Sequence, residues 1–203
     1  MNEDEAEGWL RERFGIEAID QLAAFAALVV AENAEQNLVS PASIAQIWSR
    51  HILDSAQLVS LAPAQGIWLD IGTGGGFPGI VVALLRPQPT LLVEPRRKRA
   101  EFLTRCADQL GLSGRVTVAA SKVEAVTATA DVISARAVAS VENLLQSAAA
   151  CAKKSTRWLL PRGRFDEADF AQLRQRWAGL FHVEQSLTDA GSSILVLDRV
   201  SRR

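Results

Sequence analysis

The sequence predicts an α/β fold with a seven-stranded, mostly parallel sheet, a C-terminal antiparallel hairpin and a helical N-terminal extension. Three observations support this prediction. After Pro63, short apolar runs alternate with helical stretches, which is typical of β-α-β units. A glycine-rich loop joins the first of these runs to the helix that follows it. The last two apolar runs are joined only by TDAG, which is too short for a crossover helix, so they should pair as a hairpin.

The N-terminal extension is expected to cover residues 1–62, and residues 63–203 should form the main domain, the two together making one compact unit. Residues 18–34 are strong helix formers, and NLVSP (37–41) reads as a turn. A further helix is expected over 44–62, with Ser43 as its N-cap. Its apolar stripe should be core; the stripe consists of Ile44, Ile47, Trp48, Ile52, Leu58 and Val59.

In the main domain the near-continuous apolar runs favour strands that are buried on both faces. The expected strands are 67–71, 90–94, 115–119, 131–135, 156–161, 180–187 and 192–200. The expected helices are 78–86, 96–110, 141–152 and 167–178.

Composition narrows the class of protein. With 203 residues, 48% hydrophobic and 22% charged, the chain can bury one substantial core. It has no uncharged apolar run of about 18 residues, so no membrane span is expected. The N-terminus is acidic, unlike a secretory leader. Two cysteines without a CxxC or a histidine cluster favour a reducing cytoplasm and no metal site.

The net charge of −1 gives no general support for nucleic-acid binding. Two local basic clusters stand out, however: PRRKR (95–99) and PRGR (161–164). Such clusters are usually solvated surface, but a local basic patch can also bind RNA in a protein whose total charge is near zero.

The glycine loop, DIGTGGGFPG (70–79), lies between a predicted strand and a predicted helix. Glycines there let a ligand approach the backbone, and the helix N-terminus attracts electron-rich groups. A Walker phosphate loop is excluded because no Lys-Ser or Lys-Thr follows the glycines. A nicotinamide fingerprint remains open, because Gly74, Gly76 and Gly79 spell GxGxxG and Glu94 lies twenty residues after Gly74.

The context of the loop favours S-adenosylmethionine over a nicotinamide cofactor. Gly72, Gly74 and Gly76 form a GxGxG register directly after Asp70, an acid suited to holding the methionine end of the cofactor. Glu94 ends the next strand, where it would accept hydrogen bonds from the ribose hydroxyls. The final hairpin is the usual closing feature of the Rossmann-like methyltransferase fold, and little chain is left for a dehydrogenase's substrate region.

The methyl acceptor is less constrained. Methylation of an exocyclic amine usually involves an Asn/Asp-Pro-Pro-aromatic motif after the fourth strand, where this chain has SARAVAS (134–140). Methylation at carbon 5 of a pyrimidine needs a cysteine nucleophile, but Cys106 and Cys151 are better explained as structural thiols. A guanine N7 already carries a lone pair, so positioning would suffice. A non-catalytic RNA-binding or assembly factor with the same fold remains an alternative.

Six segments in order carry a family resemblance: RHILDS, DIGTGGGFPGI, LLVEPRRKRAEFL, SKVE, DVISARAVAS and LLPRGR. From NLVSP to the last strand, the chain resembles the bacterial small-subunit ribosomal RNA guanine-N7 methyltransferases, known as RsmG or GidB. The resemblance implies a Rossmann-like class I fold and methyl transfer from S-adenosylmethionine to N7 of one guanosine in 16S ribosomal RNA. The partner would be the small ribosomal subunit or its assembly intermediate, bound by a cytoplasmic monomer.

The resemblance also implies roles for individual residues. Gly72 and Phe77 would line the cofactor pocket, Val123 and Glu124 would flank the adenine, and Arg136 would act as the catalytic residue beside the target base. The family commonly has Asp where this chain has Glu94, which changes the reach of the carboxylate. The full set of expected cofactor-binding residues is Asp70, Gly72, Gly74, Phe77, Glu94, Val123, Glu124 and Arg136.

RNA contacts are expected at the strand ends, on the edge of the sheet where ligands of α/β proteins bind. The candidates are Lys98, Arg99, Lys122 and Arg162. His51, with Arg50 and Asp54, is expected to hold the N-terminal helices against the main domain. The family often carries a basic residue where this chain has Ser192 and Ser193; Arg199, Arg202 and Arg203 are the possible substitutes.

Overall fold

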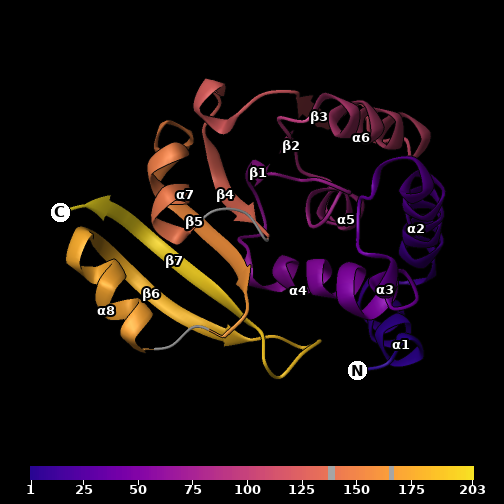
Figure 1. The fold of residues 1–203 in the computed structure, drawn as a ribbon, viewed down its shortest axis with the longest axis horizontal. Coiled ribbons are helices and arrows are strands. Elements are labelled where there is room, and N and C mark those ends of the chain that lie inside the picture. The colour runs from indigo at the N-terminus through magenta and orange to yellow at the C-terminus, as the bar shows by residue number, and fades with distance from the viewer. Residues whose placement is uncertain (137–139, 165–166) are drawn as a thin grey trace.

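A single seven-stranded sheet forms the centre of the computed structural model, which describes residues 1–136, 140–164 and 167–203 (Figure 1). The strand order is β3-β2-β1-β4-β5-β7-β6. Neighbouring strands from β3 to β5 pair in parallel, and β7 runs antiparallel to both β5 and β6. The strands are β1 (Trp68–Ile71), β2 (Thr90–Val93), β3 (Val116–Ala119), β4 (Ala130–Ala135), β5 (Ala152–Arg162), β6 (Trp177–Gln185) and β7 (Ser193–Arg202).

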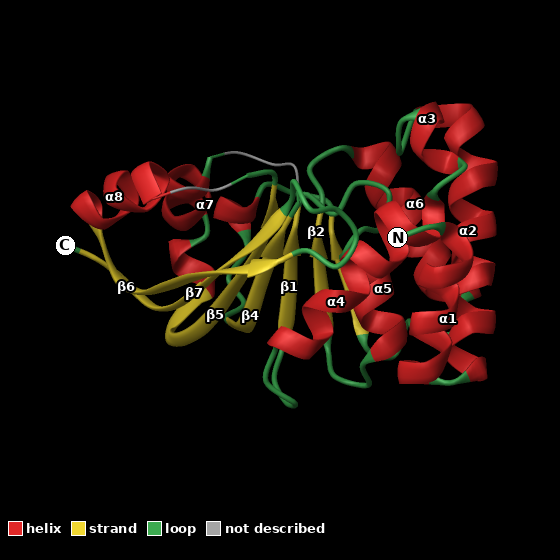
Figure 2. Cartoon of the chain, turned by 90° about the horizontal axis from the view of Figure 1, so that it is seen from below, coloured by secondary structure: helices red, strands yellow, loops and turns green. Residues whose placement is uncertain are grey.

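Helices cover both faces of this sheet (Figure 2). The N-terminal helices are α1 (Glu3–Phe14), α2 (Ile16–Gln36), α3 (Pro41–Ile44), the π-helix η1 (Trp48–Leu53) and α4 (Asp54–Leu61). The helices of the main domain are α5 (Gly79–Leu85), α6 (Arg97–Gln109), α7 (Val141–Ser147) and α8 (Glu167–Arg176), with 3₁₀ turns η2 (Val123–Ala125) and η3 (Ala149–Cys151).

The N-terminal helices share a hydrophobic core with the main domain. Leu10 of α1 and Phe25 of α2 are fully buried in the same cluster as Ile80 of α5 and Leu103 of α6. A second cluster, on the other face, joins Leu145 of α7 to residues of β1, β4, β5 and β7. Because burial of apolar surface is the main driving force of folding, the first cluster ties α1 and α2 firmly to α5 and α6.

The predicted fold class is confirmed, including the C-terminal hairpin and the single reversed strand. The expected single helix over 44–62 is wrong: the segment forms α3, η1 and α4. Ser43 is therefore no N-cap; it lies inside α3, where its hydroxyl donates to the carbonyl oxygen of Ser40. Of the apolar stripe, Ile47, Ile52 and Leu58 are buried in the core, while the other members are only partly buried.

Two helix ends also differ from the prediction. The expected helix over 141–152 ends at Ser147 and continues as the 3₁₀ turn η3. The expected helix over 167–178 ends at Arg176, because Trp177 already pairs with Arg202 in the hairpin. Part of the SARAVAS segment, residues 137–139, lies outside the described residues.

The order of the strands fixes where a ligand can bind. The connections run outward in opposite directions from β1 and β4, which makes the gap between these two strands the topological switch point. In open α/β sheets ligands bind at that point, beyond the carboxyl ends of the strands. The glycine loop follows β1 and Arg136 follows β4, so both predicted site elements lie at this edge.

Candidate active site

The glycine loop is held by hydrogen bonds at both ends. The amide of Gly72 donates to the carbonyl oxygen of Val93 over 2.7 Å, and the amide of Gly79 donates to Asp70 Oδ2 over 3.1 Å. Gly72 and Gly74 have φ of 67° and 59°, values that side-chain-bearing residues rarely adopt. The turn brings the backbone of this loop to the ligand-binding edge without side chains at these two positions.

Asp70 lies beneath the loop and is completely buried. Its Oδ1 accepts a 2.6 Å hydrogen bond from the hydroxyl of Ser134, which in turn accepts from the indole nitrogen of Trp68. Burial raises the pKa of Asp70 to about 6, and the hydrogen bonds from Ser134 and Gly79 oppose that rise. In this structure Asp70 therefore organises the loop; contact with a cofactor stays a prediction.

Glu94 occupies a similar supporting position at the end of β2. Only 3% of it is exposed, and its two oxygens accept from the amides of Gly74 and Arg96, each over 2.9 Å. A carboxylate offers about four lone-pair positions, so two remain for further donors. The longer side chain thus reaches the glycine loop itself, and its predicted contact with ribose is still a prediction.

An open cleft of about 600 Å³ lies over the carboxyl ends of β1, β2 and β3. We call it the β3-side cleft. Gly72 forms part of its floor, Val123 and Glu124 contribute from η2, and α7 closes the opposite side with Asn143 and Gln146. Val123 is buried while Glu124 is exposed, so the cleft offers an apolar wall beside a polar rim. Asn143 and Gln146 had no signal in the sequence that pointed to a ligand.

A second open cleft, of about 580 Å³, lies over the ends of β4 and β5 and the start of β7. We call it the β5-side cleft. The N-terminal helices provide one wall, with Ser43, Arg50, His51 and Asp54. The opposite wall comes from the sheet, with Arg136, Arg162 and Ser192 among its residues. The two clefts therefore lie on opposite sides of the switch point between β1 and β4.

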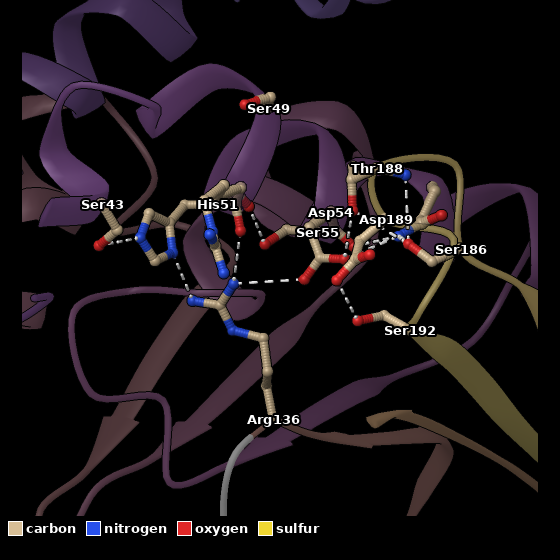
Figure 3. Close-up of polar contacts among 12 residues, drawn as sticks. Ser43, Ser49, His51, Asp54, Ser55, Arg136, Ser186, Thr188, Asp189 and Ser192 are labelled. Atoms are coloured by element: carbon tan, nitrogen blue, oxygen red, sulfur yellow. Dashed lines mark hydrogen bonds and ion pairs between the residues drawn. The ribbon is translucent and has the colours of Figure 1, made fainter. Parts of the chain in front are cut away.

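Arg136 links the sheet to the N-terminal helices (Figure 3). Its guanidinium donates to Asp54 Oδ2 over 3.3 Å, to His51 Nδ1 over 3.0 Å and to the carbonyl oxygen of Arg50 over 3.3 Å. The guanidinium also lies over the ring of Phe77, 5.3 Å from its centroid. The prediction that His51, with Arg50 and Asp54, holds the N-terminal helices against the main domain is confirmed. Arg136 was not predicted to be their partner, because it lies more than eighty residues later in the chain.

Burial dominates the electrostatics of this group. Burial raises the pKa of Asp54 and lowers the pKa of Arg136, in each case outweighing the attraction between the two charges. Burial, followed by the charges of Arg136 and Arg50, lowers the pKa of His51 to about 4. His51 is therefore neutral at neutral pH, and its ring can accept a hydrogen bond from the guanidinium.

Phe77 lies beneath this network rather than on a cleft surface. It is 4% exposed, and its ring centroid lies 5.0 Å from that of His51 and 5.1 Å from that of Phe25. Phe77 thus supports both His51 and Arg136 from the side of the core. Its contact with the cofactor stays a prediction.

The predicted RNA-binding residues are spread along the same edge of the sheet. Lys98 is exposed in the first turn of α6, and Lys122 is exposed just before η2. Arg99 is partly buried and donates to the carbonyl oxygen of Asn37 over 3.1 Å. Arg162 ends β5 and lines the β5-side cleft. Lys122 thus lines the β3-side cleft and Arg162 the β5-side cleft, while Lys98 and Arg99 lie at the start of α6.

The suggested substitutes for a basic residue at Ser192 and Ser193 are wrong. Ser193 pairs with Arg162 at the carboxyl end of β5, but β7 then runs away from this edge toward Arg202. Arg199, Arg202 and Arg203 consequently lie toward the opposite end of the strand and cannot reach the clefts. Ser192 and Ser193 instead donate hydrogen bonds to Asp189 and to the carbonyl oxygen of Gly163.

Neither a reactive thiol nor a metal cluster is found in the part of the chain that the structure describes. Cys106 and Cys151 are buried, and burial raises the pKa of the Cys106 thiol to about 12. Those described residues contain no group of three histidine, cysteine or acidic side chains able to hold a metal ion. In the same residues no helix is both long and apolar enough to cross a membrane.

The fold is that of the class I methyltransferases, and the family match makes this chain a methyltransferase that uses S-adenosylmethionine. The chain belongs to the GidB family, rRNA small subunit methyltransferase G, whose model matches residues 18–195. This membership decides against the oxidoreductase that the glycine loop alone left open and against the non-catalytic factor with the same fold.

Individual relatives agree with this membership. The ribosomal RNA small subunit methyltransferase G of Sphingopyxis alaskensis is 46% identical over 200 residues, covering 96% of this chain and 85% of the relative. That of Erythrobacter litoralis is 43% identical over 197 residues, covering 96% and 95%. Among solved structures, the mitomycin 7-O-methyltransferase MmcR shares the fold with a TM-score of 0.65 at 17% identity, over 88% of this chain and 60% of that one.

Proposed function

We propose that this protein transfers a methyl group from S-adenosylmethionine to N7 of one guanosine in 16S ribosomal RNA. Membership of the family supports the substrate class. The observation that carries the assignment to this site is the position of Arg136, which lines the β5-side cleft while its guanidinium lies over Phe77 of the glycine loop, and Gly72 of the same loop lines the β3-side cleft. Such an arrangement allows a cofactor and an acceptor to meet at one charged group.

The residues of the β3-side cleft fit the cofactor. Gly72 places backbone without a side chain at the floor, and a φ of 67° excludes most other residues there. Val123 offers an apolar surface for a purine ring, and the carboxylate of Glu94 retains two lone-pair positions for hydroxyl donors. We propose that Gly72, Gly74, Val123, Glu124 and Glu94 hold the adenosine part, with Asp70 and Phe77 supporting the loop from below.

The chemistry required of the protein is mainly positioning. When bound, S-adenosylmethionine supplies an electrophilic methyl group. A guanine N7 attacks with its own lone pair, so no side chain has to remove a proton before the transfer. Holding two reactants in an aligned geometry can be worth roughly 7 kcal/mol or more. Arg136, as the proposed catalytic residue, would orient the acceptor with its N–H donors so that N7 faces the methyl group.

RNA contacts are proposed for four cations at the carboxyl-end edge of the sheet. Lys98 and Lys122 are exposed at the edge of the sheet, and Arg99 and Arg162 lie at the same edge. Phosphate contacts of this kind fix the register of a protein on its nucleic acid, while groups in the clefts select the base. These four side chains would hold the RNA of the small subunit, or of its assembly intermediate, over the β5-side cleft.

The remaining proposals concern the whole protein. We propose that residues 1–62 and 63–203 act as one compact unit, because helices of the first part share a buried cluster with α5 and α6. We further propose that the protein works as a monomer in the cytoplasm, where its RNA substrate is found.

A methyl-transfer assay tests the proposed function. The protein is incubated with methyl-labelled S-adenosylmethionine and small ribosomal subunits from cells that lack the endogenous enzyme, and the labelled nucleoside is identified by mass spectrometry. We expect 7-methylguanosine at one position of the 16S RNA and none with the variant Gly72→Asp, whose side chain would occupy the floor of the cleft in place of the cofactor. Label in another nucleoside would contradict the proposed acceptor atom.

A further inference from the structure

The β5-side cleft combines three kinds of group that can bind a nucleotide through hydrogen bonds. Arg136 and Arg162 provide guanidinium donors, Asp54 provides a carboxylate, and Ser43 provides a hydroxyl. Each side of the cleft comes from a different part of the chain: the N-terminal helices form one wall, and the ends of β4 and β5 form the other. The N-terminal extension is therefore part of the site and not only a support for the fold.

The hydrogen bonds of His51 follow from the chemistry of its partners (Figure 3). A guanidinium has donors only, so the His51 Nδ1 that it contacts at 3.0 Å must be the unprotonated acceptor. The proton then lies on Nε2, which donates to the hydroxyl of Ser43 over 2.9 Å. The Ser43 hydroxyl donates to the carbonyl oxygen of Ser40 over 2.8 Å. In all three hydrogen bonds the donor lies on the Arg136 side, so the series runs in one direction, from Arg136 to the backbone just before α3.

These hydrogen bonds restrain one nitrogen of the Arg136 guanidinium, and other groups restrain the rest of it. Asp54 holds a second nitrogen of the guanidinium at 3.3 Å, and the ring of Phe77 lies below it at 5.3 Å from the centroid. The ring of His51 also packs on Phe77, so His51 fixes both the position of the guanidinium above the Phe77 ring and its orientation. Without an acceptor at Nδ1, one buried nitrogen of Arg136 would lose its partner, and the group would turn toward another one.

Resting on the proposed function, we propose that the β5-side cleft receives the acceptor nucleotide and that His51 is a positioning residue which holds Arg136 toward it. His51 acts through Arg136 and does not itself move a proton. The charged groups that face it are Arg50 and Asp54 from its own segment and Arg136 from the end of β4. Burial, followed by the charges of the two cations, keeps the imidazole neutral and available as an acceptor.

Two substitutions separate the roles of the two ring nitrogens of His51. In His51→Asn the amide oxygen can replace Nδ1 as the acceptor for Arg136, while the bond to Ser43 is lost. In His51→Gln the longer amide can reach Ser43 but leaves the guanidinium without its acceptor. We expect kcat to fall less than 10-fold for the Asn variant and about 100-fold for the Gln variant, the loss typical of a displaced reacting geometry. The KM for S-adenosylmethionine should stay within 2-fold, because the β3-side cleft is not changed.

His182→Asn is the matched control. His182 is the other histidine of the chain and lies half-exposed on β6, beside Glu184 and away from both clefts. Its kcat should equal that of the wild type. Thermal unfolding of all three variants identifies any loss that comes from an unstable fold. Equal losses for the Asn and Gln variants, or losses that follow their melting temperatures, would overturn the positioning role.

Two further readouts do not depend on turnover. Binding of small ribosomal subunits should weaken for His51→Gln more than for His51→Asn, and ¹⁵N NMR of His51 should show a neutral ring with the proton on Nε2 from pH 5.5 to 8. A ring protonated at pH 6, or a proton on Nδ1, would overturn the inference. If the wild type binds subunits and shows this NMR signature but transfers no methyl group, the proposed function fails while the role of His51 stands.

Discussion

At the scale of single residues, the buried carboxyl of Asp70 makes folding depend on pH. Its pKa is raised from 3.8 to about 6 by burial, so between these values the folded state holds a proton that the unfolded state releases. The contribution of Asp70 to stability is therefore greatest below pH 3.8 and falls as the pH rises to about 6. A shift of this size corresponds to a loss on the order of 3 kcal/mol.

We expect Asp70→Asn to remove this dependence. Between pH 4 and pH 7 the unfolding free energy of the wild type, measured by urea titration, should fall relative to that of the variant. His51 acts in the opposite direction, because its pKa is lowered from 6.5 to about 4 and its stabilising contribution is lost as the pH falls through that range. Comparing the wild type with Asp70→Asn separates the contribution of Asp70 from that of His51, because both proteins contain His51. A difference in unfolding free energy that is the same at every pH would show that Asp70 does not titrate as described.

Gly79 shows how little space the loop leaves at the first residue of α5. A Cβ added there would overlap the side chain of Leu92 and lie 2.9 Å from Asp70 Oδ2. We expect Gly79→Ala to lower the unfolding free energy by about 1–3 kcal/mol, as overpacking of a core usually does. Gly8→Ala is the control, since nothing lies within 4 Å of its added Cβ in the helix α1. That variant should gain about 0.5–1 kcal/mol; equal effects at both sites would contradict the packing described.

At the scale of elements, the π-helix η1 depends on a contact from the start of the chain. The two carboxylate oxygens of Glu3 accept from the amides of Trp48 and Ser49 over 2.9 and 2.8 Å, which caps the start of η1. We expect Glu3→Gln to cost about 1–2 kcal/mol, because an amide has only one oxygen to offer to two donors.

Chemical denaturation measures this loss, with Glu12→Gln as control because Glu12 is exposed on the same helix. Since η1 carries His51, Glu3→Gln should also reduce kcat. A variant with unchanged stability would show that η1 holds its conformation without the cap.

The elements also show what the sequence could and could not predict. Strands such as Trp68–Ile71 and the hairpin were predictable because apolar runs and connection lengths are local signals. The π-helix was not, because the spacings of Ile44 to Ile47 and of Trp48 to Ile52 are those of an ordinary helix and the cap comes from Glu3. The anchoring role of His51, Arg50 and Asp54 was predictable, but Arg136 as their partner was not, since it is distant in sequence and meets them only through the strand order.

At the scale of the whole molecule, the proposed RNA surface should be confined to one edge of the sheet. Lys98 is exposed at that edge, whereas Lys154 is exposed near the start of β5, at the opposite edge. We expect Lys98→Ala to reduce the salt dependence of small-subunit binding, with a loss of about 1 in the slope of log K against log salt. Filter binding at several salt concentrations measures the slope. Lys154→Ala should leave it unchanged, and an equal effect of both would contradict a one-sided surface.

The central claim is that two clefts on either side of the switch point divide the work, one holding the cofactor and the other the acceptor. The most direct test is a crystal structure with S-adenosylhomocysteine. We expect the adenine beside Val123 and Glu124, the ribose hydroxyls on Glu94, and the sulfur directed toward Arg136 and the β5-side cleft. An adenosine bound in the β5-side cleft, or a ribose beyond hydrogen-bond distance of Glu94, would contradict the account.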